Sequence, residues 1–328
     1  MKFQLRTSFW CHVEITVVSH RCFVLQVFVN VILPIFVGVG VTWLFQRWRR
    51  LDVSVLSQTT LWLFSPAFVF SNILDQQASL SGSARVTGSI LLATVLMLMI
   101  GFVVSKLFRY DRKSTSAFML STAFPNAGNM GLPVLLLAFG DPGIEVGILI
   151  FVVHAIVGFS VGIFVAASSD QVGLRPLISV FRLPTMYAFG LALLVKYLGI
   201  SLPVVILEPV SILGAAAIPV MITVLGFQLG SGVETQNLRM LFMAVIGRLI
   251  VAVPIYMVAT VLMGLSGITQ GAVIVIGAMP SAVFTTILAD EFGANPRFVT
   301  SSVVLSTAAS VVTLTILVTL IRDGILLS

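Results

Sequence analysis

Apolar residues occur in long runs along almost the whole chain, and short polar segments separate these runs. A bilayer core about 30 Å thick requires about 20 apolar residues of helix. Runs such as SILLATVLMLMIGFVV lack the alternating polarity that is typical of membrane β-barrel strands. The pattern predicts an all-α membrane protein with ten transmembrane helices, at residues 23–46, 53–74, 86–108, 115–139, 144–168, 184–199, 204–230, 239–264, 270–291 and 298–321.

The composition excludes most soluble classes of protein. Only 9% of the 328 residues are charged and 58% are hydrophobic, whereas soluble domains have about 25% charged residues. Two cysteines, Cys11 and Cys22, are too few for a disulfide framework or a four-ligand zinc site. The basic residues are scattered between apolar runs instead of forming one patch, so we expect a lipid bilayer as the environment and no nucleic acid partner. No cofactor or metal is expected.

The distribution of lysine and arginine between the spans predicts the orientation, because cytoplasmic loops are enriched in both. The even-numbered loops carry only Arg85 and Lys196. The odd-numbered loops carry Arg47, Arg49, Arg50, Lys106, Arg109, Arg112, Lys113, Arg175, Arg182, Arg239 and Arg297. We therefore expect a multi-pass protein of the bacterial cytoplasmic (inner) membrane with both termini on the outer side.

The N-terminal tail, residues 1–22, fits this topology poorly, because Lys2, Arg6 and Arg21 lie on the side predicted to be external. The tail has no apolar core followed by a cleavage site, so it is not interpreted as a signal peptide. Two alternatives stay open. The tail is an interfacial segment, or the native start of translation lies near Val24.

Prolines inside the spans recur at a near-constant displacement, which is 150, 153 and 155 residues for the three pairs Pro34 and Pro184, Pro66 and Pro219, Pro125 and Pro280. Proline is common in membrane helices, so each pair alone means little. Together they predict two five-helix repeats at 23–169 and 184–328, joined by a cytoplasmic linker at 170–183. Because five is odd, the repeats would be inverted with respect to each other, as in many secondary transporters.

The fourth and ninth spans contain residues that break helices. The fourth reads STAFPNAGNMGLPVLLLAFG, and the ninth contains GAMPSAVFTTILADEFG. Proline removes a backbone donor, and glycine costs about 1 kcal/mol relative to alanine in a helix interior. Such breaks persist at membrane depth only where protein or a water-filled cavity satisfies the freed backbone groups. Two breaks at equivalent positions predict that helices four and nine are broken and that a site lies between the repeats.

The chemistry predicted for this site is the binding of a small organic anion. A half-helix that begins at mid-membrane presents free N–H groups and the positive end of its dipole. The amides of Asn126 and Asn129 could orient a carboxylate, although asparagine also commonly caps helix ends. The residues expected to bind substrate are Asn126, Asn129, Gly128, Pro125, Pro280, Ser281 and Thr285.

The fourth span resembles the auxin efflux carrier family, whose Asn-x-Gly-x-x-Gly-x-Pro pattern is matched by Asn126, Gly128, Gly131 and Pro133. This family includes plant PIN-formed auxin carriers and bacterial carriers for malate and malonate. The resemblance implies ten spans, a central site where spans four and nine cross, and an elevator-like movement that carries an organic anion. Supporting similarity includes LPIF at 33–36, SPAF at 65–68, IPVMITVLGFQLG at 218–230, GRLIVAVP at 247–254 and STAAS at 306–310.

Four further polar residues inside or at the ends of spans are candidates for coupling or gating: Arg248, His154, Asn72 and Gln228. A membrane arginine costs about 2.5–3.5 kcal/mol on insertion scales, so Arg248 should face protein or water, either to neutralise a substrate or to hold a carbonyl at a helix break. His154 could titrate in proton coupling or simply pack as a hydrogen-bond donor.

The leading hypothesis is a secondary carrier for a small organic anion, most simply a carboxylate, and not an enzyme. The sequence contains no HExxH or GxxxxGK[ST] motif. An ion-coupled symporter of the bile acid sodium symporter type and a non-transporting membrane sensor are the alternatives. The coupling ion, proton or sodium, is open, and dimerisation among relatives makes a homodimer an expectation.

Overall fold

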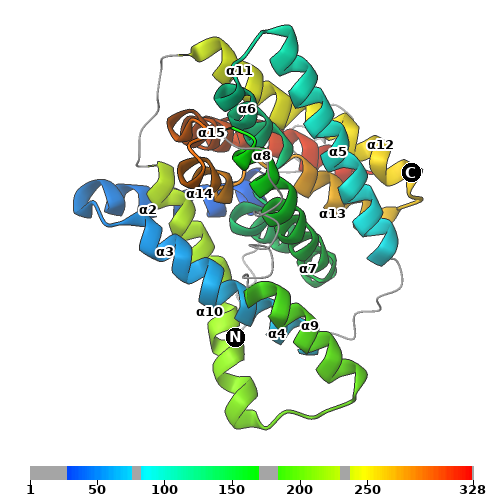
Figure 1. The fold of residues 1–328 in the computed structure, drawn as a ribbon. Helices are drawn as coiled ribbons and strands as arrows, with labels where there is room; N and C mark the ends of the chain where they lie inside the picture. The colour runs from blue at the N-terminus through cyan, green and yellow to red at the C-terminus, as the bar shows by residue number, and fades with distance from the viewer. Residues whose placement is uncertain (1–27, 76–82, 170–183, 230–236, 327–328) are drawn as a thin grey trace, which may run out of the picture.

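We describe the protein from a computed structural model, which covers residues 28–75, 83–169, 184–229 and 237–326 (Figure 1). Within these ranges the chain is helical, and its one β-type pairing is an isolated antiparallel bridge between Pro125 and Ser281. The predicted tail 1–22 and linker 170–183 lie outside the described residues. Six segments are long and apolar enough to cross a membrane: Phe28–Arg49, Ala84–Leu107, Ala127–Ala167, Val204–Phe227, Leu238–Leu262 and Pro296–Arg322. The all-α membrane class predicted from the sequence is thereby confirmed.

One group of helices, the peripheral bundle, lies on one side of the molecule and brings together segments far apart in sequence (Figure 1). Its packing depends on glycines of α10. A Cβ at Gly214 would lie 3.2 Å from the backbone of Phe68, and one at Gly226 would lie 2.5 Å from the Val39 carbonyl oxygen. The bundle comprises α2 (Leu33–Arg49), α3 (Val53–Thr59), η2 (Thr60–Phe64), α4 (Ser65–Asp75), α9 (Pro184–Tyr197) and α10 (Val204–Leu229).

The remaining helices form the central bundle, which contains most of the largest apolar cluster. It comprises α5 (Ser83–Leu107), α6 (Arg112–Ala123), η3 (Ala127–Gly131), α7 (Leu132–Val157), η4 (Gly158–Gly162), α8 (Ile163–Ala167), α11 (Leu238–Ile246), η6 (Gly247–Val251), α12 (Ala252–Leu262), α13 (Gly267–Gly277), α14 (Phe284–Glu291) and α15 (Pro296–Arg322). The short helix η1 (Phe28–Ile32) precedes α2 and contacts α7 and α15.

The helical segment α7 reverses direction at Gly140. This residue has φ 65° and ψ −152°, a conformation that favours glycine, and Pro142 follows it. After the turn, a Cβ at Gly147 would lie 2.8 Å from Leu135 Cδ1, so the two parts of α7 pack side by side. The reversal falls between the predicted fourth and fifth spans.

Helix α6 begins at a side-chain cap that fixes its first turn. The Asp111 carboxylate accepts a hydrogen bond from the Ser114 backbone N–H, Oδ1 to N 3.0 Å. This exposed cap satisfies one of the amides that a helix N-terminus leaves unpaired. Helix α6 then runs twelve residues from Arg112 to a break at Phe124, where the candidate site begins.

Candidate substrate site at the crossing of two broken helices

The two helix breaks predicted from the sequence lie against each other and pair through their backbones. The N–H of Asn126 donates to the carbonyl oxygen of Pro280 (2.8 Å), and the N–H of Ala282 donates to that of Phe124 (2.9 Å). Phe124 is extended, with φ −105° and ψ 112°. Each break thus satisfies backbone groups that the other exposes, which removes much of the cost of irregular backbone in a membrane.

Hydrogen bonds of serine and threonine hydroxyl groups stabilise this crossing. Ser281 Oγ donates to the Ser121 carbonyl oxygen (2.6 Å), and the Ser281 N–H donates to Ser306 Oγ (3.0 Å). Thr285 Oγ1 donates to the Ala282 carbonyl oxygen (2.5 Å). Ser281 and Thr285 were expected to bind substrate, and this role stays a prediction; both hydroxyl groups donate to backbone carbonyls of the crossing. Both side chains are fully buried.

Asn126 occupies the N-cap position of η3 without capping it. Its backbone has φ −75° and ψ 69°, and its side chain makes no capping hydrogen bond. The residue is 4% exposed, and Nδ2 has no hydrogen-bond partner. An unsatisfied buried donor costs about 1–3 kcal/mol. Among the described residues the Asn126 side chain therefore leaves a buried donor unpaired, and it does not cap the broken helix.

Asn129 lies within η3, is half-buried, and makes no side-chain hydrogen bond to a described residue. Because Asn126 precedes the helix, the two asparagines do not share a continuous helical face. They still lie three residues apart at one half-helix start. The turn η3 is π-helical, and such turns are frequent at functional sites.

Two glycines of the fourth-span motif are needed for close packing. A Cβ at Gly128 would lie 2.8 Å from Cε2 of Phe151, and one at Gly131 would collide with Cδ1 of Ile276. Gly128 was expected to contact substrate, and the structure places its Cα against the Phe151 ring. Pro125 and Pro280 are both buried in the crossing.

The crossing lies where the two bundles meet, since η3 packs against α10 of the peripheral bundle. A second apolar cluster continues this contact, with members from α4, α7, α9 and α10. Figure 1 shows α7 between the two groups of helices. The start of the half-helix at η3 therefore lies at the interface between the two bundles.

Arg248 is fully buried in the η6 turn and connects the ends of both broken helices. Its Nη1 donates to the carbonyl oxygen of Thr122 in the last turn of α6, 2.8 Å away. Its Nη2 donates to the carbonyl oxygen of Gly277, the last residue of α13. The structure thus places Arg248 on carbonyls at the helix breaks, one of its two predicted roles.

His154 is buried beside Tyr256. Its Nδ1 lies 2.9 Å from the Ile150 carbonyl oxygen and its Nε2 lies 3.1 Å from the Tyr256 hydroxyl oxygen. Because a carbonyl only accepts, Nδ1 carries the proton of the neutral ring, and Nε2 accepts from the hydroxyl. The side chains of Asn72 and Gln228 lie outside the part of the chain that the structure describes.

Several residues that hydrogen-bond to predicted site residues were not predicted from the sequence. Tyr256 was passed over, although a tyrosine inside an apolar span usually needs a partner for its hydroxyl. Ser121 and Ser306, whose carbonyl oxygen and hydroxyl oxygen accept from Ser281, are not among the predicted site residues either. Their roles depend on partners more than 20 residues away, such as Ser281 for Ser306.

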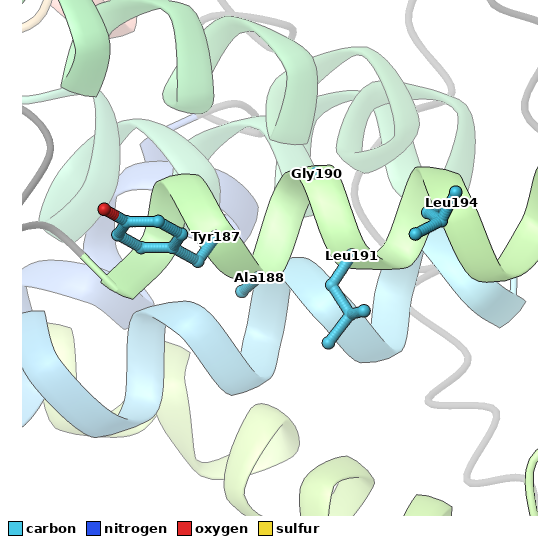
Figure 2. A pocket seen from close by; sticks show the side chains of 5 residues that line it. All are labelled: Tyr187, Ala188, Gly190, Leu191 and Leu194. Carbon is cyan, nitrogen blue, oxygen red and sulfur yellow. The ribbon is translucent and has the colours of Figure 1, made fainter.

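A separate groove of about 520 Å³ runs along one face of α9 (Figure 2). It is almost entirely apolar and contains none of the predicted site residues. Its lining residues are Tyr187, Ala188, Gly190, Leu191 and Leu194. The groove offers no group that would select an anion, so it is not the candidate site.

Comparison with known proteins identifies the family. The model of the family described as membrane transport protein matches residues 27–318. The chain belongs to this family, the auxin efflux carrier family. It is also similar to an uncharacterized transporter of Methanocaldococcus jannaschii, MJ1031, with 22% identity over 267 residues, which cover 78% of this chain and 85% of that protein. The protein is therefore a membrane transport protein of the auxin efflux carrier family, as its fourth-span motif predicted.

Proposed function

We propose that this family member is a secondary carrier for a small organic anion, most simply a carboxylate, with its binding site at the crossing of the two broken helices. The observation that carries the proposal is the buried Nδ2 of Asn126, which has no partner in the described protein. It lies at the start of the half-helix that begins with Ala127. A carboxylate oxygen would supply the missing acceptor.

The dipoles of the half-helices favour the same ligand. Helix η3 begins at Ala127 and α14 begins at Phe284, each just after a break. The first amides of a helix have no partner within the helix, and its N-terminus carries about half a positive charge. Two such ends near one crossing attract an anion without a lysine or arginine in the site, and the asparagine amides would orient it.

The order of elements supports an inverted repeat as the framework of the carrier. Helices α6 and α13 both end at the crossing, and α7 and α14 follow the two breaks. The breaks run antiparallel, with Pro125 opposite Ser281. Antiparallel pairing of equivalent segments is expected when two copies of one unit enter the membrane from opposite sides. On this basis we propose ten membrane spans, whereas six described segments are long and apolar enough to cross a membrane.

We further propose alternating access by movement of the central bundle against the peripheral bundle. The crossing belongs to the central bundle, and η3 contacts α10 of the other. A shift of one rigid bundle past the other would carry a ligand at η3 across the membrane barrier. The expected location is the bacterial cytoplasmic membrane, with both termini outside, and a homodimer is proposed from the resemblance.

A sodium-coupled carrier of the bile acid symporter type is the second candidate, and a sensor without transport is the third. Among the described residues no group of three or more His, Cys, Asp and Glu side chains is placed to hold a metal ion. Sodium would therefore depend on hydroxyl and carbonyl oxygens. Proton coupling through His154 is a further hypothesis, which the pH dependence of transport tests.

The test is counterflow in proteoliposomes with labelled mono- and dicarboxylates, comparing native protein with the double variant Asn126→Ala, Asn129→Ala. Exchange of at least one acid by the native protein and none by the folded variant would support both carrier and site. Undiminished exchange by the variant would refute the site. If no acid moves although the native protein is folded, the anion proposal is wrong, and neutral or cationic solutes are tested next.

A further inference from the structure

Helices α6 and α13 end close to each other, and the carbonyl groups at both ends point toward the guanidinium group of Arg248. The guanidinium donates to the carbonyls of Thr122 and Gly277, which lie at the C-terminal ends of the two helices. No carboxylate of the described residues shares in these contacts. Among the described residues Nε of Arg248 has no hydrogen-bond partner, and the charge of the side chain is surrounded by the two backbone carbonyls and the Tyr256 side chain.

The electrostatics of this arrangement require a cation. A helix C-terminus carries about half a negative charge, and two of them meet here. In carriers with broken helices, unwound carbonyls and half-helix C-terminal ends are the groups that coordinate a coupling cation. The anion site proposed above lies at the opposite, N-terminal ends of the following half-helices. The crossing therefore has a positive and a negative side.

We infer that Arg248 is a built-in cation in a carbonyl-lined site, and that removing its side chain opens this site to a free guanidinium ion. The inference deepens the proposed function, on which it rests, because it assigns the cation of the carrier to the protein itself. Arg248 is then a positioning residue. It ties the ends of α6 and α13 together so that both breaks keep one geometry while the ligand is carried.

The surroundings are shaped for a flat cation. Arg248 Cζ lies 5.9 Å from the centre of the Tyr256 ring. The backbone of Gly277 lies directly against that ring, because a Cβ there would collide with it. The His154 hydrogen bond holds the hydroxyl of Tyr256. The ring and the two carbonyls would remain in place around the space that a shortened side chain leaves.

The experiment measures the melting temperature and the carboxylate counterflow of Arg248→Ala with millimolar guanidinium chloride, with the same concentration of urea, and with neither. Urea has the shape of guanidinium without its charge. We expect guanidinium to raise the melting temperature of this variant by about 3 °C or more. We expect counterflow to fall roughly 100-fold without the ion and to recover partly with it. Urea should do neither.

The matched control is Arg239→Ala, on the same helical segment, whose exposed guanidinium lies 4.7 Å from the Phe108 ring centre. It should respond to none of these solutes. Equal responses of Arg248→Ala to guanidinium and urea, or no response to either, would overturn the inference. Native-like counterflow of Arg248→Ala without any added ion would overturn it as well.

The experiment distinguishes failure of the proposed carrier function from failure of the inference about Arg248. If the native protein moves no carboxylate, the proposed function fails, whereas the melting temperatures still decide the inference. If Arg248→Ala folds under no condition, Arg248→Lys decides, because lysine keeps the charge. A lysine variant that folds and transports without guanidinium would support a fixed cation, and one as unstable as the alanine variant would refute it.

Discussion

Asn126 and Pro280 are joined by a backbone hydrogen bond of 2.8 Å between segments from opposite halves of the chain. The same peptide region places the Asn126 side chain, whose Nδ2 is buried without a partner. The backbone of this residue therefore builds the crossing, while its side-chain amide has no hydrogen-bond donor role among the described residues and is the proposed ligand group. The two roles can be separated by substitution, because only the side chain changes.

Asn126→Ala should abolish anion counterflow without destabilising the folded protein, because the side chain donates no hydrogen bond to the described residues and its unpaired burial costs about 1–3 kcal/mol. Asn126→Asp has nearly the same shape and should also be inactive, since its charge repels an anion. Counterflow and thermal melting check both variants.

The control for these variants is Asn237→Ala. Asn237 caps α11 by accepting from the Met240 N–H at 3.3 Å, so its loss should cost about 1 kcal/mol of stability. Transport should persist in this variant. An Asn126→Asp protein that carries the same anion as fast as the native protein would contradict the assigned role of Asn126.

Gly131→Ala should destabilise the central bundle by about 1–3 kcal/mol, because its new methyl group would collide with Ile276 Cδ1. Ile276→Val removes that atom and alone should cost about 0.5–1.5 kcal/mol. The double variant should then be more stable than the sum of the two losses implies. Melting curves of the four proteins provide this double-mutant cycle.

A glycine without close neighbours is the comparison for this cycle. A Cβ at Gly40 in α2 would meet no atom within 4 Å. Gly40→Ala should therefore be neutral or stabilise the protein by up to about 1 kcal/mol through helix propensity. Strict additivity of Gly131→Ala and Ile276→Val would show that the predicted collision does not occur.

The sequence predicted the helical membrane class and the position of the breaks, because both depend on local signals. Long apolar runs mark membrane helices, and clustered proline and glycine mark helix interruptions. The turn at Gly140 also lies where a polar interruption separates two apolar runs. The pairing of Phe124 with Ala282 was not predictable in detail, because no periodicity encodes contacts between such distant segments.

The roles of individual side chains were harder to predict. Ser281 is predicted to bind substrate, and no pattern in the sequence indicates that its hydroxyl also donates to the Ser121 carbonyl oxygen. For Arg248 the sequence left two roles open, and the choice depends on carbonyls of α6 and α13. A polar residue in an apolar span must find a partner, but the sequence does not say whether that partner is protein or ligand.

The pH dependence of the α6 cap follows from the pKa of Asp111, which hydrogen bonds from the side chain and backbone of Ser114 lower from the ordinary value of 3.8. Because the pKa of Asp111 is lower in the folded than in the unfolded protein, its ionisation stabilises the fold at any pH above the unfolded-state pKa. This stabilisation is lost as the pH falls through the folded-state pKa. At neutral pH the free energy of unfolding of the native protein should exceed that of Asp111→Ala by about 1 kcal/mol. This difference should begin to decrease as the pH falls toward 3.8 and should vanish once the pH lies below the lowered pKa of Asp111.

Melting temperatures of both proteins from neutral to acidic pH check this sign. Asp111→Asn is the matched control, because asparagine accepts the same hydrogen bond from Ser114 without titrating. Its difference from Asp111→Ala should stay constant with pH. A native advantage over Asp111→Ala that grows in acid would contradict the assignment.

The predicted orientation is tested by labelling single cysteines with a membrane-impermeant maleimide. In a protein with Cys11→Ser and Cys22→Ser, we expect Ser201→Cys to react in intact cells and Lys113→Cys only after permeabilisation. Ser201 and Lys113 are both exposed, so access depends on the side of the membrane. The basis is the concentration of Lys106, Arg109, Arg112 and Lys113 in one loop, which should face the cytoplasm. Labelling of Lys113→Cys alone in intact cells would reverse the topology and place both termini inside.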